Sequence, residues 1–231
     1  PVAVTAAFDT FEEVIAEAPV ETFAALSGLG IVRHGFTGRV PGLDTRVDRG
    51  LALRRLDDIH LDARRHLGLG GQLFVTGEQL HGNGVALVDS NAVPPVPAVD
   101  GLITADPSVC LGIYVADCCA VYLVDSVRRV IGLLHSGRKG TELAITSAAN
   151  LMMRDRFGTN PADLLVKLSP SIRQPLYEVD FVAEIRRQCA AAGVREIHDS
   201  GACTGSNLGR YYSYRVEKGK TGRMLALLAL A

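Results

Sequence analysis

The strongest constraint on the fold is an apolar stretch in the middle of the chain. Residues 111–124 and 130–135 are rich in β-branched and aliphatic side chains, which predicts two buried strands in succession. Residues 140–157 then carry apolar side chains at helical spacing, which predicts a helix. The apolar positions of that helix are Ala144, Ala148, Leu151 and Met152. A strand, strand, helix order at the densest part of the sequence places the core there.

The flanking segments add strands and helices without a regular alternation. Further helices are predicted at residues 8–18, at 53–67 and from Phe181, where Asp180 is the expected N-cap. Further strands are predicted at residues 73–75, 85–88, 164–168 and 224–230. Runs of strands mixed with helices favour the α+β class with mixed β-sheets over regular βαβ units. We find no repeat and expect one domain over residues 1–231.

Composition excludes several classes of protein. The chain has 24 basic and 25 acidic side chains, so it lacks the positive field that holds nucleic acids or anionic membranes. No apolar run approaches the roughly 18 residues of a membrane span, and residues 1–9 do not resemble a secretory signal. We therefore expect a cytoplasmic protein whose five cysteines are reduced thiols. The oligomeric state stays open.

Two histidines and one cysteine are candidates for a metal site. His81 and His135 each lie beside glycine, which lets a backbone or ligand approach closely. Alternation along a strand puts Cys118 on the face opposite Asp117 and Cys119, so that one thiol can serve a site while its neighbour packs. Two imidazoles and one thiolate leave a fourth position open, as in catalytic zinc sites. Their separations match no short metal motif, and buried structural residues are the alternative interpretation.

Basic residues after His135 suggest an anion site. Arg138 and Lys139 precede the predicted helix, and cations at a helix start suit phosphate. Arg39 is a further candidate phosphate contact. The alternative is that all three are ordinary solvated residues. His60 and His66, on a polar helix, are expected to be solvated.

Taken together, several segments resemble the polyphenol-oxidase or laccase-domain family, whose members are also described as zinc-dependent purine nucleoside phosphorylases. The resemblance extends over nearly the whole chain, in order and with similar spacing. The matching segments are residues 34–39, 79–82, 100–104, 116–118, 135–140 and 169–172, and a tail of residues 203–204, 212–215 and 221–223.

The resemblance implies a four-layer αββα sandwich with mixed β-sheets and a catalytic metal held by His81, Cys118 and His135. Zinc is the expected cofactor, with copper as the alternative metal. The implied reactions are phosphorolysis of adenosine, inosine, guanosine and methylthioadenosine, and hydrolytic deamination of adenosine. Gln79, in the same motif as His81, is expected beside the substrate.

The sequence departs from the family pattern at three positions: Arg138, Lys139 and Ser169 stand where the family has Trp, Arg and Gly. Arginine and lysine are not equivalent at a phosphate, and a lost aromatic ring removes a packing surface. Three alternatives to the zinc phosphorylase therefore stay open. They are a metal-free hydrolase with Cys118 as nucleophile and His135 as base, a copper-dependent polyphenol oxidase, and a ligand-binding protein with reduced catalysis.

Overall fold

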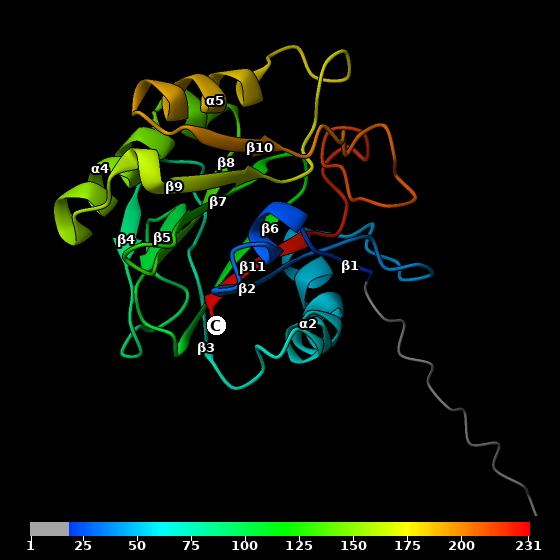
Figure 1. The fold of residues 1–231 in the computed structure, drawn as a ribbon. Coiled ribbons are helices and arrows are strands. Elements are labelled where there is room, and N and C mark those ends of the chain that lie inside the picture. Colours follow the sequence, from blue (N-terminus) through cyan, green and yellow to red (C-terminus); the bar gives the residue numbers. More distant parts are fainter. Residues whose placement is uncertain (1–18) are drawn as a thin grey trace, which may run out of the picture.

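Two mixed β-sheets stacked face to face form the centre of the molecule, and helices cover their outer faces (Figure 1). The fold was obtained as a computed structural model in which residues 19–231 are described. The helix predicted at residues 8–18 lies outside the described residues. The predicted α+β sandwich with mixed sheets is confirmed.

The first sheet has the strand order β1-β2-β11-β6-β3. Its strands are β1 (Val20–Glu21), β2 (Val32–Thr37), β11 (Met224–Leu230), β6 (Val109–Val115) and β3 (Leu73–Thr76). Only the β3–β6 pair is parallel among these strands. β11 lies in the middle because it is apolar on both faces: Ala226 and Leu228 point toward the second sheet, whereas Leu225 and Leu227 point outward.

The second sheet has the order β10-β9-β7-β8-β5-β4. Its strands are β10 (Glu196–Asp199), β9 (Leu164–Leu168), β7 (Cys119–Asp125), β8 (Val130–Ser136), β5 (Gly101–Thr104) and β4 (Val85–Leu87). The two edge pairs are parallel and the three inner pairs antiparallel. Every residue of β7 and β8 is buried, which explains much of the apolar run in the sequence. The single strand predicted over residues 111–124 is wrong, because the chain bends at residues 116–118 and divides this run into β6 and β7.

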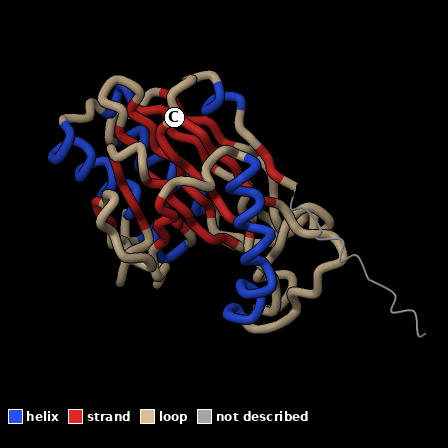
Figure 2. The backbone as a smooth tube through the Cα atoms, turned by 90° about the horizontal axis from the view of Figure 1, so that it is seen from below, coloured by secondary structure: helices blue, strands red, loops and turns tan. Residues whose placement is uncertain are grey.

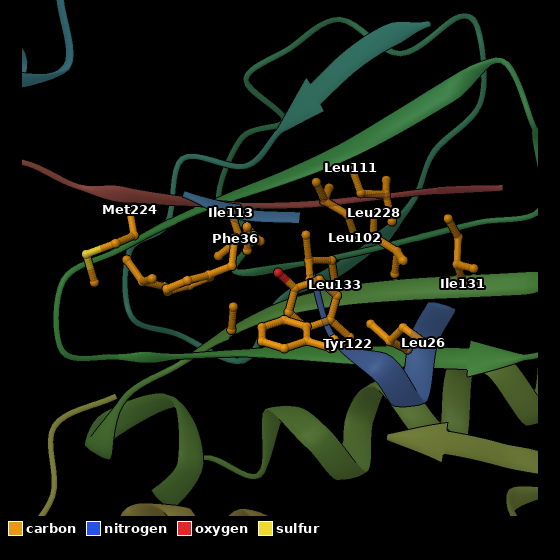
Figure 3. Packing of buried hydrophobic residues seen from close by; sticks show 14 of the residues in the cluster. Leu26, Phe36, Leu102, Leu111, Ile113, Tyr122, Ile131, Leu133, Met224 and Leu228 are labelled. Carbon is orange, nitrogen blue, oxygen red and sulfur yellow. The ribbon is translucent and has the colours of Figure 1, made fainter. Parts of the chain in front are cut away.

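The main core lies between the two sheets (Figure 3). Phe36 and Leu228 from the first sheet meet Tyr122 and Leu133 from the second. The hydroxyl of Tyr122 donates a 2.8 Å hydrogen bond to the carbonyl of Gly35, so the largest polar group in this layer is satisfied and also ties the sheets together.

Helices form the outer layers, as Figure 2 shows from below. The helices are α1 (Ala24–Ser27), α2 (Arg49–His66), α3 (Arg138–Glu142), α4 (Ile145–Phe157) and α5 (Phe181–Ala191), with a short 3-10 turn at Pro161–Asp163. α1 is the exception to the outer layers, because its Leu26 packs in the core between the two sheets. α4 and α5 pack on the outer face of the second sheet. α2 lies against the first sheet, where His60 contacts the ring of Tyr114. Asp180 caps α5 by accepting from the backbone N–H of Ala183, as predicted.

The helix predicted at residues 140–157 is divided in two. Ala144 has a left-handed backbone with φ of 59°, which ends α3 and starts α4 in a new direction. α4 consequently buries Ile145, Ala149 and Met153, whereas Leu151 is exposed, so the predicted apolar stripe is wrong by one position. Among residues 19–231, no helix combines the length and the apolar character that crossing a bilayer requires.

Candidate metal centre

His81, Cys118 and His135 converge at one end of the two sheets. His81 lies in the loop between β3 and β4, Cys118 in the turn between β6 and β7, and His135 near the end of β8. Each offers one ligand atom, and these atoms all lie within 4.8 Å of one another. The two imidazole rings are 4.7 Å apart between centroids and are inclined by 74°.

The β7–β8 hairpin brings Cys118 next to His135. Ala120 pairs with His135 and Cys119 with Ser136, so the residue preceding β7 meets the end of β8. Gly137 follows, and a Cβ atom at this position would lie 2.5 Å from the Cys118 sulfur. Only glycine leaves room for the sulfur there.

Asp100 forms hydrogen bonds with both histidines of the site. Its fully buried carboxylate accepts hydrogen bonds from the backbone N–H groups of Leu80, His81 and Gly82 at 3.1, 2.9 and 2.8 Å. The same carboxylate accepts from Nδ1 of His135 at 2.8 Å. Since Nδ1 is occupied, Nε2 is the nitrogen of His135 that remains for a ligand.

The pair of Cys118 and His135 carries opposite charges. Burial disfavours a Cys118 thiolate, but the charge of His135 and hydrogen bonds from His135 and His81 outweigh burial and lower its pKa to about 6. Burial likewise disfavours a charged His135, but the attraction of Cys118 and the hydrogen bond to Asp100 raise its pKa to about 9. These opposite pKa shifts favour a thiolate facing an imidazolium when no metal is bound.

The three side chains open into a cavity of about 1100 Å³. Its wall combines cationic side chains with aromatic and apolar ones. The cations are Arg49, Arg138, Lys139, Arg215, Lys218 and Arg223. The aromatic residues are Tyr114, Tyr177, Phe181 and Tyr214. Such a wall suits a flat ring joined to an anionic group.

Two of these cations, Arg49 and Arg223, lie close enough to repel each other. Arg223 is buried, and its guanidinium donates to the carbonyls of Thr221 and Gly222. Burial lowers the pKa of Arg223, and repulsion by Arg49 lowers it further. Two positive charges that repel each other favour the binding of an anion in the cavity.

A family profile described as multi-copper polyphenol oxidoreductase laccase matches residues 59–184 and 179–231. The chain belongs to this laccase family. A Streptomyces griseus member named purine nucleoside phosphorylase is 33% identical over 190 residues, which cover 70% of this chain and 76% of the relative. A Deinococcus radiodurans member with the same name is 32% identical over 232 residues, covering 86% and 89% of the two chains.

Solved structures of the laccase family share the fold. The crystal structure of YlmD from Geobacillus stearothermophilus superposes with a TM-score of 0.80 at 25% identity, covering 86% of this chain and 92% of that one. A Bacillus licheniformis protein, YfiH, gives a TM-score of 0.77 at 25% identity, with 87% and 93% covered. This chain therefore shares its fold with both solved structures.

The structure brings most of the predicted substrate residues to the cavity, but not Arg39. Arg138 and Lys139 line the cavity wall, and Arg138 pairs with Glu142 at 2.8 Å. Arg39 instead donates to Glu217 at 2.6 Å and stacks over the ring of Tyr212, away from the cavity lining. These contacts connect Arg39 to the loop that carries Tyr212 and Glu217.

Gln79 lines the cavity, but its amide is already engaged. Its nitrogen donates to the carbonyl of Tyr114 at 2.6 Å, and its oxygen accepts from the N–H of Tyr114 at 2.9 Å. The side-chain amide thus bonds to the backbone of Tyr114 as a neighbouring strand would, and it connects the His81 loop to β6. Positive φ angles of 59° at Gln79 and 61° at His81 show why this loop needs fastening.

Two expectations about neighbouring residues are wrong. Asp117 lines the cavity although alternation predicted that it would point away, because its φ of 82° interrupts the strand before β7. Its carboxylate accepts from the hydroxyl of Thr204 and from the N–H of Arg215. His60 is buried rather than solvated, because it lies beside the apolar stripe of α2 and faces Tyr114.

Sequence reasoning also missed Asp100, Arg49 and Arg223 as site residues. Asp100 stands in a segment that matches the laccase family, but nothing in its spacing ties it to His81 or His135. Arg223 precedes a buried strand and looks like a strand-end residue. Only the fold brings these groups to one place.

The donor set fits a zinc ion. Two imidazoles and one low-pKa thiol are ligands that zinc prefers, and three protein ligands are typical of catalytic sites. Hydrogen bonding of Nδ1 to a carboxylate is the usual support of a zinc-bound histidine.

Proposed function

We propose that this protein is a zinc-dependent purine nucleoside phosphorylase in which His81, Cys118 and His135 hold the metal. The observation that carries the proposal is the convergence of these three ligand atoms on a cavity with a cationic and aromatic wall. The names of the Streptomyces griseus and Deinococcus radiodurans relatives support the same activity. Adenosine, inosine, guanosine and methylthioadenosine are the proposed nucleosides.

The residues of the cavity divide the work of binding. Arg49 and Arg223 present two positive charges that attract phosphate, and Lys139 adds a third in the cavity lining. Tyr114 and Tyr214 offer ring faces to the purine. Phosphorolysis then joins a phosphate oxygen to the sugar carbon as the bond from that carbon to the base breaks. Cations near the phosphate hold it in place for this exchange.

When bound, zinc supplies a Lewis acid that polarises an oxygen atom of the reactants. Asp100 and Gln79 keep the metal-holding loop in shape. We extend the proposal to adenosine deamination, in which water replaces the amino group of the base and ammonia leaves. Both reactions use the same aromatic wall to place the base.

The test is a nucleoside panel with a metal analysis. The purified protein is assayed with inosine or adenosine, with and without inorganic phosphate, and its metal content is measured by mass spectrometry. We expect base and ribose phosphate to form only with phosphate, with one zinc ion per chain. Full activity after complete removal of metal would contradict the proposal, as would binding of nucleoside without any turnover.

A second candidate function has its own observation. The Cys118 thiolate and His135 imidazolium resemble the nucleophile and base of a cysteine hydrolase. This function requires the metal-free protein to hydrolyse an amide or ester. It leaves the exposed imidazole of His81 without a task, and we therefore rank it below the phosphorylase. Oxygen consumption with a phenol and copper tests the remaining oxidase alternative.

A further inference from the structure

We propose that Asp100 is the positioning residue that sets both histidine ligands in place before a metal binds. The inference rests on the proposed metal-dependent function but assigns a role to a residue outside the ligand set. The carboxylate of Asp100 reaches two segments that are far apart in the sequence, namely the His81 loop and β8.

The first contact orients the ring of His135. The carboxylate accepts from Nδ1 at 2.8 Å, and the carbonyl of Asp100 also accepts from the backbone N–H of His135 at 2.7 Å. Ring and backbone are therefore held by the same residue. This double attachment fixes the direction in which Nε2 points, because the ring cannot rotate without losing the bond to the carboxylate.

The second contact shapes the loop that carries His81. Three successive N–H groups, from Leu80, His81 and Gly82, point at the two carboxylate oxygens of Asp100. Backbone N–H groups arranged in this way form a concave anion site, and here the anion is a side chain of the protein. His81 has a φ of 61°, a conformation that persists only where surrounding contacts enforce it.

Burial makes this arrangement rigid. Asp100 has no exposed surface, and all four of its side-chain hydrogen bonds lie between 2.8 and 3.1 Å. A buried carboxylate with several donors tolerates little displacement, because each lost bond leaves a charged or polar group without a partner. The ring of His135 and the backbone that carries His81 are consequently preset, and zinc binding does not have to order them.

The decisive experiment measures zinc affinity of the Asp100→Asn variant. An asparagine keeps the size of the side chain but replaces one acceptor oxygen with an NH₂ group that faces donors. We expect zinc affinity, measured by competition with a chromogenic chelator, to fall about 10- to 100-fold, the usual effect of losing a group that orients a ligand. Hydrogen exchange of the amides at residues 80–82 should accelerate in the same variant.

Asp125→Asn is the matched control. Asp125 is equally buried and also accepts hydrogen bonds from backbone N–H groups, those of Val127 and Arg128. It lies at the end of β7 that is farther from Cys118. This variant should keep the zinc affinity of the unaltered protein. Equal zinc affinity of Asp100→Asn and the unaltered protein would overturn the role of Asp100 alone. An unaltered protein that binds no zinc would overturn the proposed function as well.

A measurement on the unaltered protein covers the case in which Asp100→Asn does not fold. Nuclear magnetic resonance of the zinc-loaded protein with ¹⁵N-labelled histidine reports which ring nitrogen keeps its proton. We expect His135 to retain the proton on Nδ1, the atom bonded to Asp100. A proton on Nε2 with Nδ1 bound to zinc would overturn the proposal.

Discussion

Cys118 and Cys119 are neighbours in the chain but belong to two different regions of the molecule. Cys118 faces the cavity and packs beside the core between the sheets. Cys119 belongs to the core between the second sheet and its helices, where its sulfur lies 3.8 Å from the carbonyl of Ser169. One peptide unit therefore separates a reactive environment from an inert one.

The chemistry of the two thiols differs because their partners differ. Burial outweighs the hydrogen bonds with Ser169 at Cys119 and raises its pKa to about 12. Burial also acts on Cys118, but two imidazoles reverse the effect and lower its pKa to about 6. The contrast shows that charge partners, more than depth, decide which cysteine is a ligand or a nucleophile. Ser169, the departure from the family glycine, lies on the Cys119 side.

The largest effect is expected for Cys118→Ala. Removing the sulfur should abolish zinc binding, with a loss of affinity greater than the roughly 100-fold that orienting residues contribute, and phosphorolysis should disappear with it. His135→Ala should behave in the same way, and both variants should remain folded. Cys119→Ala is the matched control and should keep metal and turnover. Retention of zinc by Cys118→Ala would refute its assignment as a ligand.

A second expected difference is the reactivity of the two thiols in the metal-free protein. At pH 7, about nine-tenths of a thiol with a pKa near 6 is thiolate, whereas a thiol with a pKa near 12 is almost entirely protonated. Iodoacetamide should therefore modify Cys119→Ala at residue 118 and leave residue 119 of Cys118→Ala untouched. The rate at Cys118 should fall as the pH drops below about 6. Equal modification of residue 118 in Cys119→Ala and of residue 119 in Cys118→Ala would contradict the predicted difference between the two thiols.

Gly137→Ala should disturb the Cys118 side selectively. The new methyl group would lie 2.5 Å from the Cys118 sulfur and must displace it. We expect zinc affinity to fall about 10-fold or more, as for other changes that misplace a ligand. Gly132→Ala, on the strand β8 that precedes Gly137, meets side chains at 3.3 Å and should affect thermal stability without changing zinc affinity. Chelator competition and thermal unfolding of both variants distinguish the two effects.

The smallest effect is expected for the stability of Cys119→Ala. The variant removes one buried sulfur atom and its weak contacts, so the free energy of unfolding should fall by about 1 kcal/mol. Urea denaturation measures this change. A loss of more than about 3 kcal/mol would mean that Cys119 supports the site as well as the core.

The sequence predicted part of the strands and part of the site; β1, β2, β5 and β10 were not predicted. Strands with continuous apolar runs, such as β7, β8 and β11, were found because burial on both faces leaves a plain signature. The three side chains that converge, His81, Cys118 and His135, were singled out because thiol and imidazole side chains are few. Asp100 was not found, since nothing in an aspartate's local sequence shows which distant N–H groups it will meet.

Backbone conformations explain the other misses. The division of the predicted helix depends on a left-handed Ala144, and the orientation of Asp117 depends on a φ of 82°. Side-chain periodicity assumes a regular backbone and fails wherever tertiary contacts enforce another conformation. Arg49 and Arg223 were missed for a different reason, because they meet only when α2 and the start of β11 come together.

The central place of β11 has a consequence for biosynthesis. β2 and β6 do not pair with each other; each pairs with β11, which the ribosome produces after both. The nascent chain must therefore carry two unpaired strand edges until β11 emerges, a period in which chaperones would have surfaces to shield. Assembly of this sheet therefore waits for β11 rather than proceeding strand by strand.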